Sequence, residues 1–408
     1  AANTTGVCAI GQFALSSNTA DFNTSVGYES LRYNTSGAGN IAVGKSALYN
    51  NTTASNNTAV GLAALTANTT GTGNLAIGSN ALDANTTASY NIAVGNNALG
   101  ANTTGDRNVA LGYEAMFTNT DGDRSVAIGM QALYNQNPSS NADMNNVAIG
   151  HSAGFEITTG TNNIAIGAGA LDANTTASNN TAVGNSALSA NTTGEKNTAV
   201  GAEAFQNNTT ASNNTAFGRR AGKANTTGTL LVAIGQGALE SNTTANSNTA
   251  VGCNALNLNT TGANNTAVGD EAMISNTTGA ENVAVGKYAL DANTTASAGT
   301  AVGYGALSSN TTGASNTAFG YFAMLGNTTG QNNTCVGHGS MQANTTGGYN
   351  VAMGRASLDA NTTGGQGVAL GAFALTSNTE GNYNIGIGYE ALELNTTGDQ
   401  NIAIGYLA

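Results

Sequence analysis

Apolar and small residues recur along the whole chain at a fixed interval of seventeen residues. Variants of one motif, Asn-Thr-Ala-Val-Gly, occur 24 times, with the closing glycine running from Gly11 to Gly405. The spacing differs from seventeen only twice, at sixteen residues between Gly11 and Gly27 and at twenty-one between Gly129 and Gly150. A fixed short period over a whole chain indicates a repeat array in which each unit stacks on its neighbours.

The repeat reads Asn-Thr-Ala-Val-Gly-x-x-Ala-Leu-x-x-Asn-Thr-Thr-Gly-x-x, and its residues are numbered here as repeat positions 1 to 17. Position 4 is apolar in every repeat, and position 3 is Ala in 21 of 24. Position 9 is Leu, Met or Phe in 21 of the 23 complete repeats. The β-branched residues predict a short strand at positions 1 to 4, ended by glycine, and a second extended segment at positions 8 to 10. Frequent Gly and Asn disfavour a helix.

These elements predict an all-β protein, a rod-shaped β-solenoid of 24 coils of about seventeen residues. Coils stacked at about 4.8 Å give a rod on the order of 115 Å long. Residues 1–408 form a single continuous solenoid in this prediction. Residues 130–149 form a longer coil, because four extra residues and the sole proline, Pro138, are inserted there.

Strand alternation assigns the two sides of each predicted strand. Positions 3 and 4 face opposite ways, and we expect the larger position 4 residue to lie inside with position 9. The restriction of position 3 to small residues then indicates that a neighbouring chain packs closely there. This reasoning predicts inter-chain packing at Ala42, Ala59, Ala76, Ala93, Ala182, Ala199, Ala301 and Ala318.

Three stretches resemble a known family: "SVAIG" at 125–129, "NVALG" at 108–112 and "NNIAIGAGAL" at 162–171. They are similar to the YadA-like head β-roll of trimeric autotransporter adhesins. The resemblance implies a left-handed β-roll, three chains side by side, and projection from a bacterial surface to bind host matrix or other cells. The repeat is longer than the family's usual coil, by an Asn-Thr-Thr-Gly loop. Longer stretches of this sequence also resemble stretches of repeat tail-fibre and filament proteins.

The charge and composition of the chain limit the classes of partner that it is expected to bind. The net charge is −12 and only ten Lys and Arg residues occur, scattered along the chain, so we expect no nucleic-acid partner. No apolar run approaches the roughly 20 residues of a membrane span. The three cysteines, Cys8, Cys253 and Cys335, lie too far apart to suggest a disulfide framework. The chain begins and ends within a repeat, which we read as a fragment of a longer protein or as subunits that stack end to end.

The "NTT" at positions 12 to 14 matches the Asn-x-Ser/Thr acceptor pattern for N-linked sugars. The same residues make a good turn, and stacked Asn side chains form ladders in β arrays, so both interpretations stay open. In a variant of the glycosylation interpretation, the sugar is attached to the neighbouring Thr instead of the Asn. The candidate glycosylated residues are Asn34, Asn51, Asn68, Asn85, Asn102, Asn174, Asn191, Asn208, Asn225, Asn242, Asn259, Asn276, Asn293, Asn310, Asn327, Asn344, Asn361 and Asn395.

Catalytic and metal chemistry have little support. The two histidines, His151 and His338, occupy a variable position just after the glycine, and no catalytic triad or cofactor motif accompanies them. Acidic residues recur in rows that could bind calcium, but they seldom occupy consecutive repeats, and solvated charge is the favoured reading. The rows are Glu29, Glu114, Glu203, Glu271 and Glu390 at position 7, and Asp83, Asp172, Asp291 and Asp359 at position 10.

These patterns favour a non-enzymatic, extracellular or cell-surface structural fibre, an adhesin-like filament without cofactor or metal. Its main partner is itself, as a trimer or polymer packed side by side and end to end, with glycans or cell-surface molecules as further ligands. A phage tail-fibre or receptor-binding shaft is the alternative. A glycan-active solenoid enzyme and an ice-binding protein are weaker alternatives.

Overall fold

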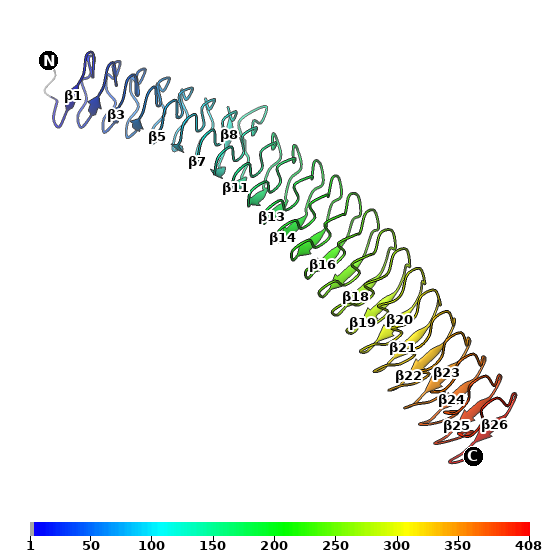
Figure 1. Ribbon diagram of the computed structural model, residues 1–408. Coiled ribbons are helices and arrows are strands. Elements are labelled where there is room, and N and C mark those ends of the chain that lie inside the picture. Colours follow the sequence, from blue (N-terminus) through cyan, green and yellow to red (C-terminus); the bar gives the residue numbers. More distant parts are fainter. Residues whose placement is uncertain (1–3) are drawn as a thin grey trace. The chain divides into compact units, whose positions relative to one another are not determined.

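The computed structural model describes residues 4–408, which form two compact units that divide at Thr210 and Ala211. Each unit is a stack of coils, with a three-residue strand at positions 2 to 4 of each repeat and no helix among the described residues (Figure 1). The predicted all-β solenoid with coils of about seventeen residues is therefore confirmed.

The strands of unit 1 are β1 (Cys8–Ile10), β2 (Thr24–Val26), β3 (Ile41–Val43), β4 (Thr58–Val60), β5 (Leu75–Ile77), β6 (Ile92–Val94), β7 (Val109–Leu111), β8 (Gly122–Asp123), β9 (Val126–Ile128), β10 (Ala142–Asp143), β11 (Val147–Ile149), β12 (Ile164–Ile166), β13 (Thr181–Val183) and β14 (Thr198–Val200). Those of unit 2 are β15 (Thr215–Phe217), β16 (Val232–Ile234), β17 (Thr249–Val251), β18 (Thr266–Val268), β19 (Val283–Val285), β20 (Thr300–Val302), β21 (Thr317–Phe319), β22 (Thr334–Val336), β23 (Val351–Met353), β24 (Val368–Leu370), β25 (Ile385–Ile387) and β26 (Ile402–Ile404).

Neighbouring strands pair in parallel, and the repeat period sets their register. Ala59 of β4 lies opposite Ala76 of β5, and Ala250 of β17 lies opposite Ala267 of β18. The glycine at position 5 ends each strand. A Cβ on Gly61, where φ is +141°, would lie 2.3 Å from the carbonyl oxygen of Gly78 in the next coil. Only glycine fits this close approach of two backbones.

The interior of each coil is the opposite of the one expected. Position 3 points inward: Ala59 is fully buried together with Leu65 of position 9. At Gly386, the one position 3 glycine, a Cβ would lie 3.2 Å from the Leu375 side chain. Position 4 therefore points outward, and the assignment of Val and Ile to the core is wrong. The coil is too narrow to hold a branched side chain opposite Leu, so only a small residue fits inside the strand.

This reversal also corrects the predicted inter-chain contacts. A residue without exposed surface in a single chain offers nothing to a neighbouring chain, so the small size of position 3 reflects packing within the coil. The alanines concerned are all 0% exposed: Ala42, Ala59, Ala76, Ala93, Ala182, Ala199, Ala301 and Ala318.

The second extended segment, predicted at positions 8 to 10, is absent from the described coils. Positions 6 to 11 form a turn in which positions 7 and 9 have left-handed backbone, as at Ala63 (φ 56°) and Leu65 (φ 53°). Two left-handed residues within three bend the chain sharply, so Leu65 enters the interior from a turn rather than from a strand. Glycines at these positions, Gly154 at position 9 and Gly169 at position 7, are the sequence signal for this conformation.

Two rows of asparagine run through the interior beside the alanine and leucine rows. At position 12, Asn68 Nδ2 donates to Asn51 Oδ1 in the preceding coil (3.0 Å) and to the Gly71 carbonyl oxygen (3.0 Å). At position 1, Asn57 Nδ2 donates to the same carbonyl (2.9 Å), and Asn57 Oδ1 accepts from the Asn74 N–H (2.9 Å). The Asn ladder, one of the two interpretations of "NTT", is therefore present at position 12, and a second ladder accompanies it at position 1.

The predicted longer coil keeps the strand register. β9 and β11 pair directly, with Val126 opposite Val147, although twenty-one residues separate them. The extra residues project as a loop that adds the short parallel pair β8 and β10. Gln136 replaces Asn at position 12 and is fully buried. Its longer side chain donates to Asn119 Oδ1 (3.3 Å) and accepts from Asn146 Nδ2 (2.9 Å), so it connects the two asparagine rows.

Candidate functional surface

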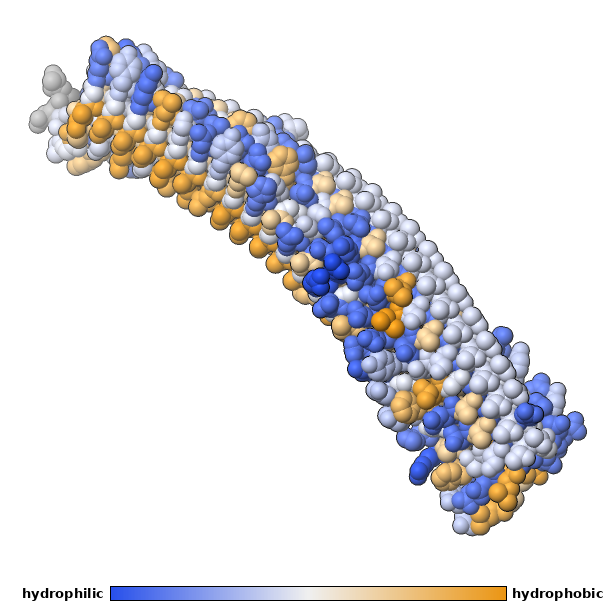
Figure 2. Space-filling model, in the orientation of Figure 1, coloured by the Kyte–Doolittle hydropathy of each residue, from blue (hydrophilic) through white to orange (hydrophobic). Residues whose placement is uncertain are grey.

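The outward side chains of positions 2 and 4 form one continuous surface on each unit, named here the strand face. In unit 1 it exposes aliphatic residues to different extents: Ile41 is 43% exposed, Ile77 39% and Ile92 38%. Threonines such as Thr58 and Thr181 occupy position 2 in other coils and are half-buried. Figure 2 shows the resulting hydrophobic band along the side of unit 1 on which the strands lie.

In unit 2 the same face carries larger groups. Phe217 is 44% exposed, Phe319 55% and Met353 46%, all at position 4. No strand-face position in the described residues of either unit holds Asp, Glu, Lys or Arg. Position 6, two residues further along the chain, takes Lys45, Asp270 and other charged residues. The lack of charge is therefore a property of the strand face rather than of the outer surface in general.

The asparagines of "NTT" are the interior row described above. A sugar on Nδ2 would replace a hydrogen that the ladder uses, and the side chains have no room for it. The expectation of N-linked sugar on them is therefore corrected to a structural role. Exposure is 0–1% for Asn34, Asn51, Asn68, Asn85, Asn102, Asn174, Asn191, Asn208, Asn225, Asn242, Asn259, Asn276, Asn293, Asn310, Asn327, Asn344 and Asn361. Asn395 is half-buried, and its Nδ2 donates to Asn378 Oδ1 and to the Gly398 carbonyl oxygen, both at 3.0 Å.

The two threonines of the motif differ in role. The position 13 hydroxyl donates to a backbone carbonyl of the next coil, as from Thr52 Oγ1 to the Thr69 oxygen (3.2 Å). The position 14 residues, such as Thr53 and Thr70, are exposed. A sugar on threonine, unlike one on the asparagines, would therefore meet solvent at position 14.

The remaining candidate residues are dispersed. His151 and His338 are exposed, and the His338 ring stacks on Tyr321 at 5.2 Å. Among the described residues no three His, Cys, Asp or Glu side chains gather closely enough to hold a metal ion. Cys8 and Cys253 are exposed free thiols. Cys335 is buried at position 3, and burial raises the pKa of its thiol to about 12.

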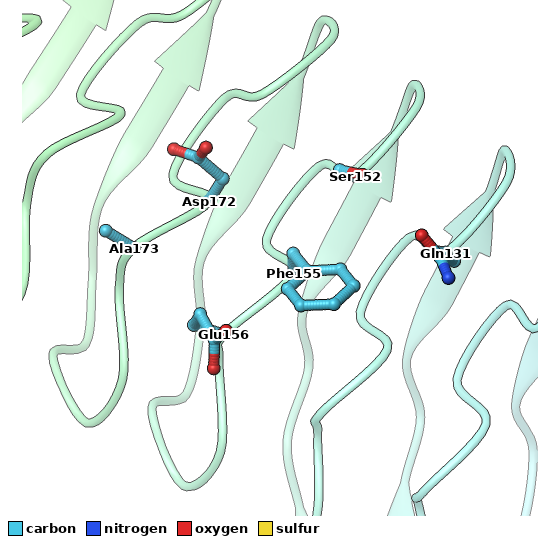
Figure 3. Close-up of a pocket in the computed structure, with 6 residues that line it drawn as sticks. All are labelled: Gln131, Ser152, Phe155, Glu156, Asp172 and Ala173. Atoms are coloured by element: carbon cyan, nitrogen blue, oxygen red, sulfur yellow. The ribbon is translucent and has the colours of Figure 1, made fainter.

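A pocket in unit 1 is a feature that sequence reasoning missed. The rings of Phe117, Tyr134 and Phe155, at position 10 of successive coils, stack at 5.5 and 5.1 Å between centroids. The stack ends at Phe155 because the next coil has Asp172 at position 10. A cavity of about 350 Å³ lies there, as Figure 3 shows, lined by Gln131, Ser152, Phe155, Glu156, Asp172 and Ala173. The aromatic residues at position 10 of three successive repeats are the sequence feature that could have indicated this pocket.

Burial raises the pKa of the Asp172 carboxyl, and the nearby charge of Glu156 raises it further. Burial also raises the pKa of the other position 10 carboxyls, Asp83, Asp291 and Asp359. Asp172 and Asp291 each have one buried carboxylate oxygen without a hydrogen-bond partner. Such an atom carries an uncompensated desolvation cost.

Comparison of the chain with protein-family models, with curated proteins and with solved structures found no match in any of the three. None of the described residues belongs to a helix that is long and apolar enough to cross a membrane.

Proposed function

We propose that this chain is a non-enzymatic structural subunit of an extracellular fibre, and that copies of it pack side by side through the strand face. The observation that carries the proposal is the strand face itself, an uncharged and largely aliphatic surface along every described coil. A band of apolar side chains that continues from coil to coil is more extended than the separate small apolar patches that monomers usually leave exposed.

The internal packing supports the same proposal. Ala, Leu and the two asparagine rows already fill the coil, so the Val and Ile of position 4 contribute little to the core. A partner that covers these side chains would explain why position 4 is apolar in every repeat although it faces outward. A second copy of the chain is the simplest such partner, since its own strand face is equally uncharged and has the same coil spacing.

The proposed location is extracellular or at a cell surface. The resemblance to adhesin heads and to tail-fibre and filament repeats supports this location, as does the small number of charged residues. In this proposal glycans and cell-surface molecules are secondary ligands, and the ends of one chain meet those of the next. Electron microscopy of native material tests the fibre directly, since isolated single-chain particles would contradict it.

Sedimentation velocity tests side-by-side packing. The variant Val183→Lys/Val200→Lys places two charges on the strand face of β13 and β14. We expect the wild-type chain to sediment as an oligomer and this variant as the 40.2 kDa monomer, because burying unpaired ammonium groups is unfavourable.

The matched control is Asn185→Lys/Ala202→Lys, which adds the same charge at exposed position 6 of the same two coils. It should remain oligomeric. A wild-type chain that stays monomeric at high concentration would contradict the proposal. An equal response of the two variants would show that net charge, rather than the strand face, controls association.

A further inference from the structure

We propose that the pocket between Phe155 and Asp172 of unit 1 binds a guanidinium group. The site is independent of the strand face and of the proposed assembly, because position 10 belongs to the turn side of the coil. Figure 3 shows that Phe155 and Glu156 leave one coil while Asp172 and Ala173 leave the next; Gln131, from the coil before, completes the lining.

The shape of the pocket favours a flat ligand. Phe155 stacks on Tyr134 with an angle of only 10° between the ring planes, so one face of Phe155 is covered and the other looks toward the next coil. There the short side chain of Asp172 takes the place that a fourth ring would occupy. Because coils repeat at about 4.8 Å, the space left over Phe155 is about one ring thick. A planar group placed there continues the stack.

The polar lining favours a ligand that only donates hydrogen bonds. Two carboxylates line the pocket, that of the half-buried Asp172 and that of the exposed Glu156. The Gln131 amide nitrogen already donates to Glu114 (3.0 Å), and Glu156 uses only Oε2 to accept from Asn135 Nδ2 (2.9 Å). A guanidinium group has five donors and no acceptor, and it pairs with carboxylates in a planar fork.

Other ligand classes fit less well. An ammonium group is compact and strongly hydrated, so it neither stacks on the ring nor fills a slot. A sugar could stack on Phe155, but it is neutral and would leave the half-buried Asp172 carboxylate without a counter-charge. A guanidinium group stacks on aromatic faces and also compensates both charges.

The chain contains internal controls for this site. Four aspartates occupy position 10, but only Asp172 follows an aromatic residue at the same position of the preceding coil. The residues preceding the four are Thr66 for Asp83, Phe155 for Asp172, Ile274 for Asp291 and Gln342 for Asp359. Asp291 also has an unpartnered buried oxygen, but the preceding coil there has Ile274 in place of Phe155 and Ser275 in place of Glu156.

Saturation-transfer NMR titrations of the full chain at fixed ionic strength test the proposal. The probes are methylguanidinium, N-acetylarginine amide, N-acetyllysine amide and cellobiose. We expect both guanidinium probes to bind, and the lysine probe and cellobiose to bind at least several-fold more weakly. Tighter binding of the arginine amide than of methylguanidinium would identify an arginine side chain of a polypeptide as the source, and equal binding a small free guanidinium compound.

Variants link the binding to the pocket. Asp172→Asn keeps the shape and Phe155→Leu removes the ring face, and each should raise the Kd of the arginine amide by about tenfold or more. Asp291→Asn should leave that Kd unchanged, and circular dichroism verifies that all variants are folded. Lysine and arginine probes that bind equally, preferential binding of cellobiose, or a Kd that Asp172→Asn does not change would each overturn the proposal.

Discussion

The two outer sides of each coil are exposed to similar extents but differ in sequence. The strand face holds only aliphatic, aromatic, Thr, Met and Cys residues in the described coils. The turn face, defined by positions 6, 7, 10 and 11, varies from coil to coil. It takes Lys45, Asp270 and Arg355, and it carries the stacks that include Tyr134 and Tyr321.

Exposure alone therefore does not explain which residues a position accepts. Repeats that diverge freely on one side while staying uncharged on the other indicate a requirement on the second side beyond folding of the single chain. On the strand face we attribute that requirement to packing against another copy. On the turn face the divergence allows local sites, of which the pocket beside Phe155 is one.

The glycine at position 5 connects the strand face to the turn face, so its replacement should disrupt both sides of the coil. In Gly61→Ala the new Cβ would meet the Gly78 carbonyl oxygen at 2.3 Å in a left-handed backbone. We expect about 4 kcal/mol or more of local destabilisation, because neither backbone can move without loss of strand pairing. Hydrogen exchange of the amides of β4 and β5 measures it. The control Leu62→Ala, at a 51% exposed neighbour, should leave exchange unchanged. Equal protection in Gly61→Ala would refute the close approach.

Truncation inside and outside one coil should give unequal effects. Leu65→Ala removes a fully buried side chain and should cost about 2–5 kcal/mol of unfolding free energy, whereas Val60→Ala should cost about 1 kcal/mol or less. Denaturant titrations under dilute, monomeric conditions compare them. Ala59→Val, which overfills the interior, should cost about 1–3 kcal/mol. A larger loss from Val60→Ala than from Leu65→Ala would restore the original assignment of the interior.

The sequence allowed prediction of the repeat and of the stacked β-coils, because both follow from periodicity, and it offered the position 12 ladder as one of two interpretations of the Asn-Thr-Thr motif. It could not assign the inside of the strand. Alternation places Ala59 and Val60 on opposite sides, but only the width of the coil decides which side is interior. The small substitutes Ser25, Cys335 and Gly386 at position 3 are consistent with a narrow interior as well as with a neighbouring chain. The pocket depends on neighbours seventeen residues apart at a variable position, so no single repeat indicates it.

The smallest expected effect concerns the carboxyls of the turn face. Burial raises the pKa of Asp291, so the folded chain binds a proton more readily than the unfolded chain. Unfolding free energy should therefore increase as the pH falls from neutral through the raised pKa, and this gain is lost again as the pH rises. Asp291→Asn removes the desolvated charge. It should stabilise the chain at pH 7 by a few tenths of a kcal/mol, a small value because solvent screens a half-buried group.

The same variant should have no stabilising effect at a pH low enough to protonate Asp291 in both states, because the neutral acid and the amide are then equivalent. Thermal unfolding at pH 7 and at acid pH, with an alanine substitution of the exposed Gln236 as control, measures the difference. On the strand face no group titrates in this range, so Val251→Ala should give the same change in Tm at both pH values. A pH-dependent effect of Val251→Ala would mean that charged groups act on the strand face, contrary to the distinction between the two sides of the coil.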